Sequence, residues 1–262
     1  MKPPITVVNP PINNVKPRKI NILGVNFDDV TFEQAVSRAA ELTERGGCCV
    51  TPNPEIVWLA RNDREFLDTI NAADLVVADG VGVMYAARLR NTPLAAKIPG
   101  IDLAAAVLEI AAKSADGRGV FLFGAKPGTA ERAAAKLQAK FPGLRIAGVQ
   151  DGYDYDTPEL QARIRGVNPA AVFVCLGSPK QELWIRDYIA RYPEQTSLLI
   201  GLGGAIDAFA GVVRRAPEAW RRRNLEWLYR LLKQPARIKR MSALPKFLLA
   251  AMFAGQSNGN ES

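Results

Sequence analysis

Apolar runs rich in β-branched residues alternate along the chain with segments whose apolar positions recur at helical spacing. This alternation begins at residue 19 and is typical of a mostly parallel sheet covered by helices on both faces. Strands are predicted at residues 19–25, 48–52, 75–79, 119–125, 144–150, 170–177 and 197–203. Helices are predicted near residues 32–45, 54–71, 81–90, 101–115, 128–140, 157–166 and 179–191. The pattern therefore predicts an α/β, doubly wound fold.

Polar residues and glycines follow five of the predicted strands. They are Thr51 and Asn53; Asp79 and Gly80; Gly124 and Gly128; Gly177, Ser178, Lys180 and Gln181; and Gly203, Gly204 and Asp207. In doubly wound sheets, ligands bind beyond the carboxyl ends of the strands, where helix N-termini attract anions. We expect the functional site among these residues.

Simpler structural explanations exist for each of these motifs. Glycines after strands permit tight turns, and no segment has the full G-x-G-x-x-G or G-x-x-x-x-G-K-[ST] pattern of a nucleotide-binding loop. Asp79 is equally well explained as the cap of the following helix. Asp154 and Asp156 have the D-x-D spacing of a divalent metal site, but an acidic turn before a helix at Thr157 accounts for them as well.

The composition narrows the chemistry that is available to the chain. Its 262 residues are 48% hydrophobic, enough to bury the core of one α/β domain with an appendage. There is no histidine, so a general base must be a carboxylate, lysine, tyrosine or cysteine. Cys48, Cys49 and Cys175 are predicted to be structural thiols in a reducing cytosol, because their number is odd and two of them are adjacent.

Four regions are predicted along the chain. Residues 1–18 hold many prolines and no signal-peptide core, so we expect a disordered arm and no secretion. Residues 19–213 form a Rossmann-like core, residues 214–254 a basic amphipathic appendage and residues 255–262 a disordered tail. No apolar run is long enough to cross a bilayer.

Nearly all of the charge imbalance is in the appendage. Residues 1–210 hold 23 basic and 23 acidic residues, so the formal net charge of +8 arises in residues 211–262. On a helix, one face carries Leu225, Leu228, Tyr229 and Leu232, and the opposite face carries Arg223, Trp227 and Arg230. Tryptophan beside arginine is typical of an interfacial helix, so an anionic membrane surface is the expected partner. Alternatively, the apolar face packs against a second copy of the chain in a homo-oligomer.

A series of motifs in a fixed order identifies a family. The motifs are "TPNPE", "ADLVVADGVGV", "KIPGIDL", "FLFGAKPG", "FPGLRIAGVQDGY", "CLGSPKQELWI", "GLGGAIDAFAG", "RRAPEAW" and "LEWLYRLLKQPARIKR". Over residues 20–241 the chain resembles the WecG/TagA/CpsF bacterial glycosyltransferases. The resemblance implies transfer of a sugar from a UDP donor to an undecaprenyl-diphosphate-linked saccharide, with inversion, at the cytoplasmic membrane face. Teichoic acid, enterobacterial common antigen and exopolysaccharide are the polymers that such enzymes serve.

The resemblance also implies roles for individual residues. Asp79 falls on the catalytic base, and Asp207 falls near the nucleotide. The expected substrate-binding residues are Thr51, Asn53, Gly80, Lys97, Gly124, Gly177, Gln181, Asp207, Arg230, Arg237 and Arg240. Lys97 stands where the family usually has arginine, and a lysine cannot form the bidentate hydrogen bonds that an arginine makes with a phosphate. For the three tail arginines, the alternative is a solvated basic face.

The expected chemistry needs no histidine, metal or cofactor. An unperturbed aspartate is ionised at neutral pH and suffices as a base when proton transfer lags behind an oxocarbenium-like transition state. Helix N-terminal amides and cationic side chains stabilise the departing diphosphate. UDP-N-acetylmannosamine is the first expectation for the donor, by resemblance, ahead of its uronate, UDP-glucose and UDP-galactose.

Two other classes of function compete with a glycosyltransferase. The basic tail and a pI of about 9.5 suit a nucleic-acid-binding protein, but the neutral body and the absence of a reading motif argue against it. A nicotinamide-dependent oxidoreductase shares the fold class, but its glycine fingerprint is incomplete here. We therefore expect no nucleic-acid partner.

Overall fold

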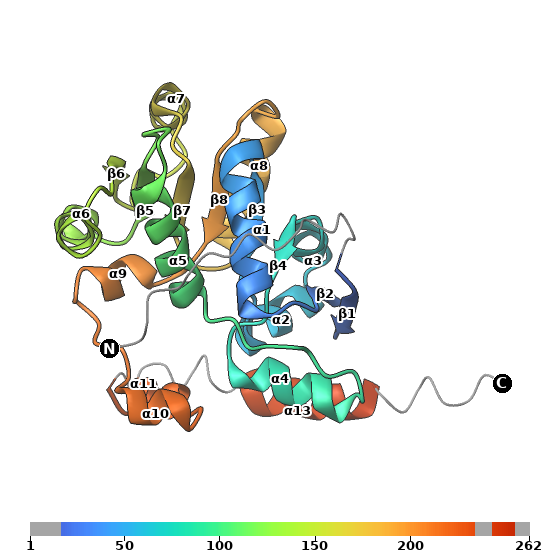
Figure 1. The fold of residues 1–262 in the computed structure, drawn as a ribbon. Helices are drawn as coiled ribbons and strands as arrows, with labels where there is room; N and C mark the ends of the chain where they lie inside the picture. Colours follow the sequence, from blue (N-terminus) through green and yellow to red (C-terminus); the bar gives the residue numbers. More distant parts are fainter. Residues whose placement is uncertain (1–16, 234–242, 255–262) are drawn as a thin grey trace.

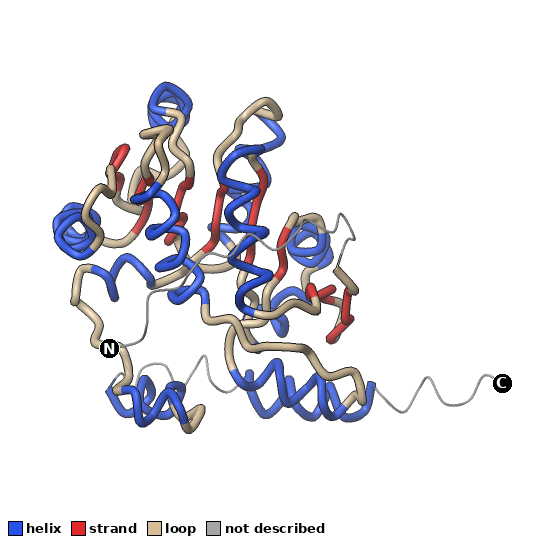
Figure 2. The backbone as a smooth tube through the Cα atoms, in the orientation of Figure 1, coloured by secondary structure: helices blue, strands red, loops and turns tan. Residues whose placement is uncertain are grey.

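A six-stranded parallel sheet forms the centre of the molecule (Figure 1). The structure is a computed structural model and describes residues 17–233 and 243–254. In spatial order, the strands are β4 (Leu75–Val76), β3 (Gly47–Val50), β8 (Leu198–Gly201), β7 (Ala171–Cys175), β5 (Val120–Gly124) and β6 (Ile146–Gln150). Helices cover both faces (Figure 2), which confirms the predicted fold class.

One of the seven predicted strands lies outside this sheet. Residues 19–25 were expected to form a strand, but they form β1 (Lys19–Ile22) and the turn into β2 (Val25–Asp28), which together make an antiparallel hairpin. Leu23 and Gly24 both have positive φ, as the tightest hairpin turns require. The hairpin is fixed to the sheet edge because the buried Asp28 carboxylate accepts a hydrogen bond of 2.7 Å from the Val76 amide.

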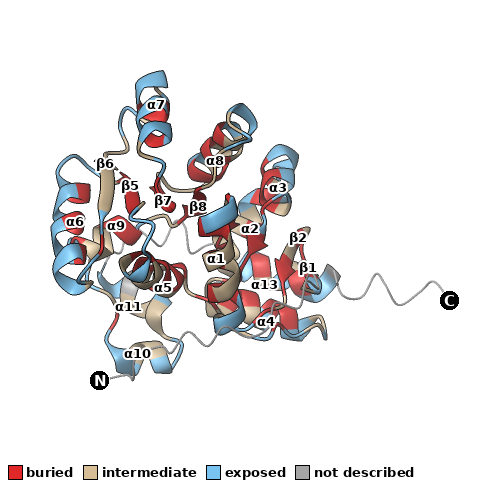
Figure 3. Cartoon of the chain, turned by 45° about the horizontal axis from the view of Figure 1, so that its top comes forward, coloured by how far each residue is buried: buried red, intermediate tan, exposed pale blue. Residues whose placement is uncertain are grey.

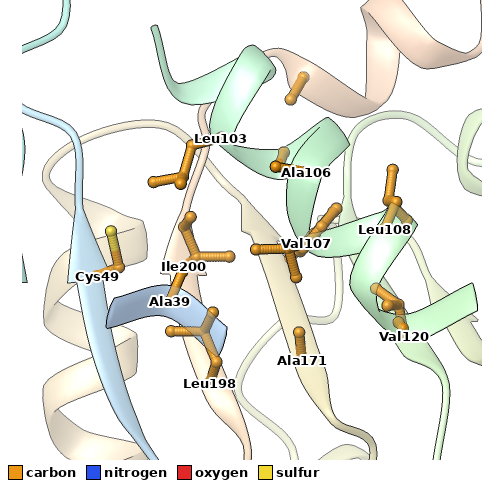
Figure 4. Close-up of a cluster of buried hydrophobic side chains, with 14 of the residues drawn as sticks. Ala39, Cys49, Leu103, Ala106, Val107, Leu108, Val120, Ala171, Leu198 and Ile200 are labelled. Atoms are coloured by element: carbon orange, nitrogen blue, oxygen red, sulfur yellow. The ribbon is translucent and has the colours of Figure 1, made fainter. Parts of the chain in front are cut away.

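Side chains that alternate along the strands pack into separate layers on the two faces. On one face, residues such as Cys49, Val120, Ala171 and Ile200 pack against four helices (Figure 4). These helices are α1 (Phe32–Arg45), α5 (Gly100–Lys113), α6 (Thr129–Lys140) and α9 (Ala205–Phe209). Because both faces are covered, the strands are apolar at nearly every position.

Two further apolar clusters cover the opposite face. Over β5 and β7, Phe121, Phe123 and Val172 pack against α7 (Pro158–Val167) and α8 (Lys180–Arg191). Beside β3 and β4, the cluster is built from the hairpin and four helices. These are α2 (Pro54–Arg61), α3 (Arg64–Asn71), α4 (Val81–Leu89) and α13 (Ala243–Ala254). Each of these four helices has a buried side that faces the sheet or a neighbouring helix (Figure 3).

The helix predicted over residues 54–71 is two helices. It breaks at Asn62 and Asp63, and the Asp63 carboxylate caps α3 by accepting a hydrogen bond of 3.0 Å from the Phe66 amide. Aspartate is a strong N-cap residue, so a new helix start competes with continuation of the first helix. The break lets α2 and α3 pack against each other.

The C-terminal helices differ in how they are held. The short helices α10 (Glu218–Arg222) and α11 (Glu226–Lys233) contact each other, and the rings of Trp220 and Tyr229 lie 5.7 Å apart. Trp227 is exposed as predicted, but Leu232 is also 63% exposed, so the packed face of α11 is narrower than expected. Neither these helices nor any other described one is long and apolar enough to span a membrane.

Helix α13 packs on the core, although the sequence groups it with the appendage. It contacts α2 and α4, and its Phe247 and Ala251 side chains are fully buried among theirs. Phe253 on the same helix is 66% exposed. The chain therefore returns to the core after residue 242 and ends its described part there (Figure 1).

Replacing Phe247 by alanine tests this docking. We expect Phe247→Ala to lower the free energy of unfolding by about 3–5 kcal/mol, because a buried ring is lost and a cavity remains. Phe253→Ala, the control on the same helix, should change it by less than about 0.5 kcal/mol. Urea unfolding followed by circular dichroism measures both values, and equal effects would contradict the packing of α13.

Candidate active site

A cavity of about 510 Å³ opens at the carboxyl ends of β3, β4 and β8. The residues that follow these three strands line it, and so does part of the segment between α9 and α11. Six residues predicted to form the site meet there: Thr51, Asn53, Asp79, Gly80, Lys97 and Asp207. This is the location expected for a ligand in a doubly wound sheet.

Asp79 is held in the cavity wall by its own backbone. Its amide donates to the carbonyl of Pro52 over 3.1 Å, which continues the pairing of β3 with β4 beyond the strands. Its carboxylate accepts a hydrogen bond of 3.4 Å from the Gly100 amide, at the start of α5. Asp79 does not cap α4, because Gly80 is the N-cap and no side chain within residues 17–233 and 243–254 bonds to that helix end. The capping explanation of Asp79 is therefore wrong.

Gly80 turns the chain from the β4 end into α4. Its φ of +92° is in the region that favours glycine. The first residues of α4, Val81 and Gly82, follow it along the cavity wall. Since this helix end lacks a side-chain cap, its amides and dipole provide positive potential at the cavity.

Thr51 and Asn53 line the cavity and also hold the local structure. The Thr51 hydroxyl donates to the Gly201 carbonyl over 3.3 Å, which ties the end of β3 to β8. The Asn53 side-chain oxygen accepts from the Ile56 amide over 3.0 Å and caps α2. Asp207 lies in the first turn of α9, and its carbonyl accepts from Val212 and Val213.

Two contacts hold the C-terminal segment against the cavity. Lys97 donates from its Nζ to Asn224 Oδ1 over 2.7 Å. Arg215 forms a two-pronged ion pair with Asp102, with distances of 2.6 and 2.7 Å. Lys97 and Asp102 both belong to the "KIPGIDL" segment. That segment therefore anchors residues from more than 100 positions later in the chain.

Arg215 is a functional candidate that the sequence analysis missed. Burial is the largest single influence and works to lower the pKa of its guanidinium, but the hydrogen bonds to Asp102 and the nearby negative charges together outweigh it, so the pKa is raised. The charges of Glu226 and Asp79 act in the same direction. Arg215 and Asp102 stand in quoted motifs, "RRAPEAW" and "KIPGIDL", but no sequence spacing pairs them.

The other predicted site residues lie elsewhere or outside the described atoms. Gly124 and Gly177 do not line the cavity; a Cβ on Gly124 would lie 2.3 Å from the Cys175 carbonyl oxygen, so this glycine permits close strand packing. Gln181 is buried, does not line the cavity, and forms hydrogen bonds with Gly177, Glu182 and Gly203. The side chain of Arg230 and all of Arg237 and Arg240 lie outside the described part of the structure.

The cysteines are thiols with no disulfide partner. Burial raises the pKa of Cys48 to about 11 and the pKa of Cys175 to about 12. Burial likewise raises the pKa of Cys49 well above its ordinary value. These groups are protonated at neutral pH, which agrees with the predicted structural role and leaves no thiolate nucleophile.

The acidic D-x-D loop lies away from the cavity. Asp154 is exposed, and Asp156 accepts a hydrogen bond of 3.0 Å from Gln161 Nε2 at α7. Within residues 17–233 and 243–254, no three acidic or cysteine side chains gather as a metal site would require. The turn before the helix at Thr157 accounts for this motif, since Thr157 caps α7.

Comparison with known proteins identifies the family. Residues 20–260 match the model of the glycosyl transferase WecG/TagA/CpsF family. The chain belongs to this family. It is therefore a glycosyltransferase, and the cavity with Asp79 is the candidate active site of this WecG/TagA/CpsF member.

Similar proteins align with most of this chain. An "N-acetylglucosaminyldiphosphoundecaprenol N-acetyl-beta-D-mannosaminyltransferase" from Bacillus subtilis (strain 168) is 39% identical over 232 residues, 88% of this chain and 89% of that protein. A protein of the same name from Staphylococcus aureus (strain MW2) is 37% identical over 234 residues, 88% of this chain and 91% of that protein. The similarity thus spans the core and the C-terminal segment.

Breaking the Arg215 ion pair tests whether it anchors the C-terminal segment. In Asp102→Asn, an amide N–H group faces the guanidinium, so about 1–2 kcal/mol of stabilisation is lost. Hydrogen exchange of amides in residues 214–226 should speed up about 5- to 30-fold, because each 1.4 kcal/mol is a factor of ten. Asp68→Asn, which breaks the exposed pair with Arg64, is the control. Unchanged exchange in the first variant would show that the pair is not an anchor.

Proposed function

We propose that the chain transfers N-acetylmannosamine from its UDP donor to undecaprenyl-diphosphate-linked N-acetylglucosamine, with inversion at the anomeric carbon. The names of the B. subtilis and S. aureus relatives support the sugar and the acceptor. The observation that carries the mechanism is the position of Asp79 in a cavity at the carboxyl edge of the sheet. UDP-glucose and UDP-galactose are the alternative donors.

Asp79 acts as the general base in this proposal. The acceptor hydroxyl oxygen bonds to the anomeric carbon while the bond from that carbon to the UDP oxygen breaks. The hydroxyl proton moves to the Asp79 carboxylate, and the bonding electrons leave with the diphosphate. The hydrogen bond from the Gly100 amide and the backbone bond to Pro52 fix the carboxylate for this step.

Positive groups around the cavity stabilise the departing diphosphate. Arg214, Arg215 and Lys97 line the cavity together with the uncapped N-terminus of α4. Such preorganised charges are most effective where water is excluded, and the segment that carries Arg215 closes one side of the cavity. The tail arginines Arg230, Arg237 and Arg240 are proposed to add contacts to the donor or lipid diphosphate.

The proposed acceptor is a lipid, so the enzyme works at the inner face of the cell membrane as a peripheral protein. Apolar side chains are exposed on three helices that each contribute residues to the cavity lining. Examples are Trp227 on α11, Tyr85 on α4 and Met252 on α13. Rings and aliphatic chains of this kind enter the headgroup region, and basic residues beside them attract anionic lipids.

Removing the charge of Asp79 tests the base. In Asp79→Asn, the side-chain oxygen still accepts from Gly100, but the amide cannot take a proton. We expect the rate of transfer to fall by about 10²–10⁴-fold. Calorimetry should find UDP binding within about threefold of wild type, since the side chains are nearly the same size and the cavity keeps its shape. Asp187→Asn on the exposed side of α8 is the control. Undiminished transfer by Asp79→Asn would rule out Asp79 as the base.

Chelation of metal ions tests the proposed independence of a metal. We propose that backbone amides and cationic side chains stabilise the charge of the departing diphosphate. The rate of transfer in excess EDTA should therefore remain within about twofold of the untreated rate. Asp154→Asn, which alters the acidic loop, should give the same result. A loss that added Mg²⁺ or Mn²⁺ restores would contradict a metal-independent reaction.

A further inference from the structure

Two polar side chains are buried at the start of α8, beside the cavity but not in it. Gln181 and Glu182 are each only 2% exposed, and neither lines the cavity. They lie between the ends of β7 and β8, where two glycine turns connect the strands to their helices. Buried polar groups are costly unless their hydrogen-bonding atoms have partners. Among the described residues, the Gln181 oxygen and nitrogen and Glu182 Oε1 have partners, whereas Glu182 Oε2 is buried and has none.

The Gln181 amide joins the two glycine turns. Its Oε1 accepts a hydrogen bond of 3.2 Å from the Gly177 amide, at the end of β7. The same oxygen accepts a bond of 2.9 Å from the Gly203 amide, at the end of β8. The fit is close, because a Cβ on Gly201 would lie 2.9 Å from Gln181 Nε2. Gln181 thus connects adjacent strand ends.

The Glu182 carboxylate determines which way this amide faces. Its Oε1 accepts from Gln181 Nε2 and from the Ser178 hydroxyl, both over 2.8 Å. If the Gln181 amide were reversed, its NH₂ group would face two N–H donors and its oxygen would face a carboxylate. Burial raises the pKa of Glu182, while the hydrogen bonds from Gln181 and Ser178 work to lower it. The carboxylate thus favours a single amide orientation.

The residues on both sides of the turn at Gly203 form part of the cavity wall. Leu202, Gly204, Ala205 and Asp207, which flank it, all line the cavity. A shift of this turn would therefore move the wall that carries Asp207. Small displacements of positioning groups cost large factors in rate, because reacting atoms must be aligned closely.

We propose that Glu182 is a positioning residue for sugar transfer: it orients the Gln181 amide, which holds the turn at Gly203 and with it the cavity wall that carries Asp207. This inference rests on the proposed function for its substrates. It assigns Gln181 an indirect role, although the resemblance implies contact with the substrate. Glu182 and Gln181 form a matched carboxylate and amide pair that touches neither substrate.

Exchanging the two side chains tests the pair. In Gln181→Glu alone, two carboxylates meet in a buried site, and the turn at Gly203 loses its fixed partner. We expect kcat/KM for UDP-N-acetylmannosamine to fall about 10- to 100-fold, mainly through a higher KM, as for a buried group that loses its partner. In Gln181→Glu with Glu182→Gln, a carboxylate oxygen at position 181 replaces the amide oxygen as acceptor for both turns, and the amide at position 182 donates to that carboxylate. We expect recovery to within about fivefold of wild type.

Each result distinguishes positioning from direct contact. If Gln181 bound the donor itself, the second substitution would restore nothing, and such a result would overturn the inference. Recovery in KM, measured well below the unfolding temperature of each variant, supports positioning, because a purely structural role would move stability alone. Glu159→Gln, at the exposed first turn of α7, is the matched control. If the wild-type chain neither binds UDP nor transfers the sugar, the proposed function fails first and the inference falls with it.

Discussion

The hydrogen bond from the Asp79 amide to the Pro52 carbonyl is the contact on which the candidate active site depends. It extends the pairing of β3 and β4 past their last residues, after a similar bond of 3.0 Å from Val77 to Val50. The Ile98 amide adds a bond of 2.8 Å to the Ala78 carbonyl. The backbone of Asp79 is thus fixed, and its carboxylate accepts a hydrogen bond of 3.4 Å from the Gly100 amide. A carboxylate proposed as the base benefits from such a support, because it is positioned before substrate arrives.

The C-terminal segment makes an open sheet edge into a cavity. Arg215 reaches Asp102 in the first turn of α5, and Asn224 reaches Lys97 in the loop before that helix. Helix α13 then packs on α2 and α4, and its Leu244 lines the cavity. Between these anchors and α13, the described part of the segment exposes the Trp227 ring, which suits the proposed acceptor held in a membrane. The core and the C-terminal segment therefore line the same cavity.

The sequence predicted the layers of the fold and the edge of the sheet that holds the site. Both depend on local signals, namely apolar runs and the polar residues that follow them, and six predicted residues meet in the cavity. The pairing of Arg215 with Asp102 spans 113 positions, so no local pattern reveals it. The burial of Gln181 was not predicted for a similar reason. The resemblance implied that it binds substrate, and its contact with the turn at Gly203 depends on how distant parts of the chain pack together. The strand predicted over residues 19–25 ran from β1 through the hairpin turn and left most of β2 unpredicted, because the turn is only two residues long.

The most direct test of this account is a crystal structure of the full chain with UDP-N-acetylmannosamine. The account predicts that the nucleotide sugar fills the cavity beside Thr51, Asp79 and Arg215, with the Asp79 carboxylate on the side of the anomeric carbon opposite the diphosphate. Gln181 and Glu182 should keep their mutual hydrogen bond and touch no ligand atom. A donor bound outside this cavity, or with its diphosphate against Asp79, would contradict the account.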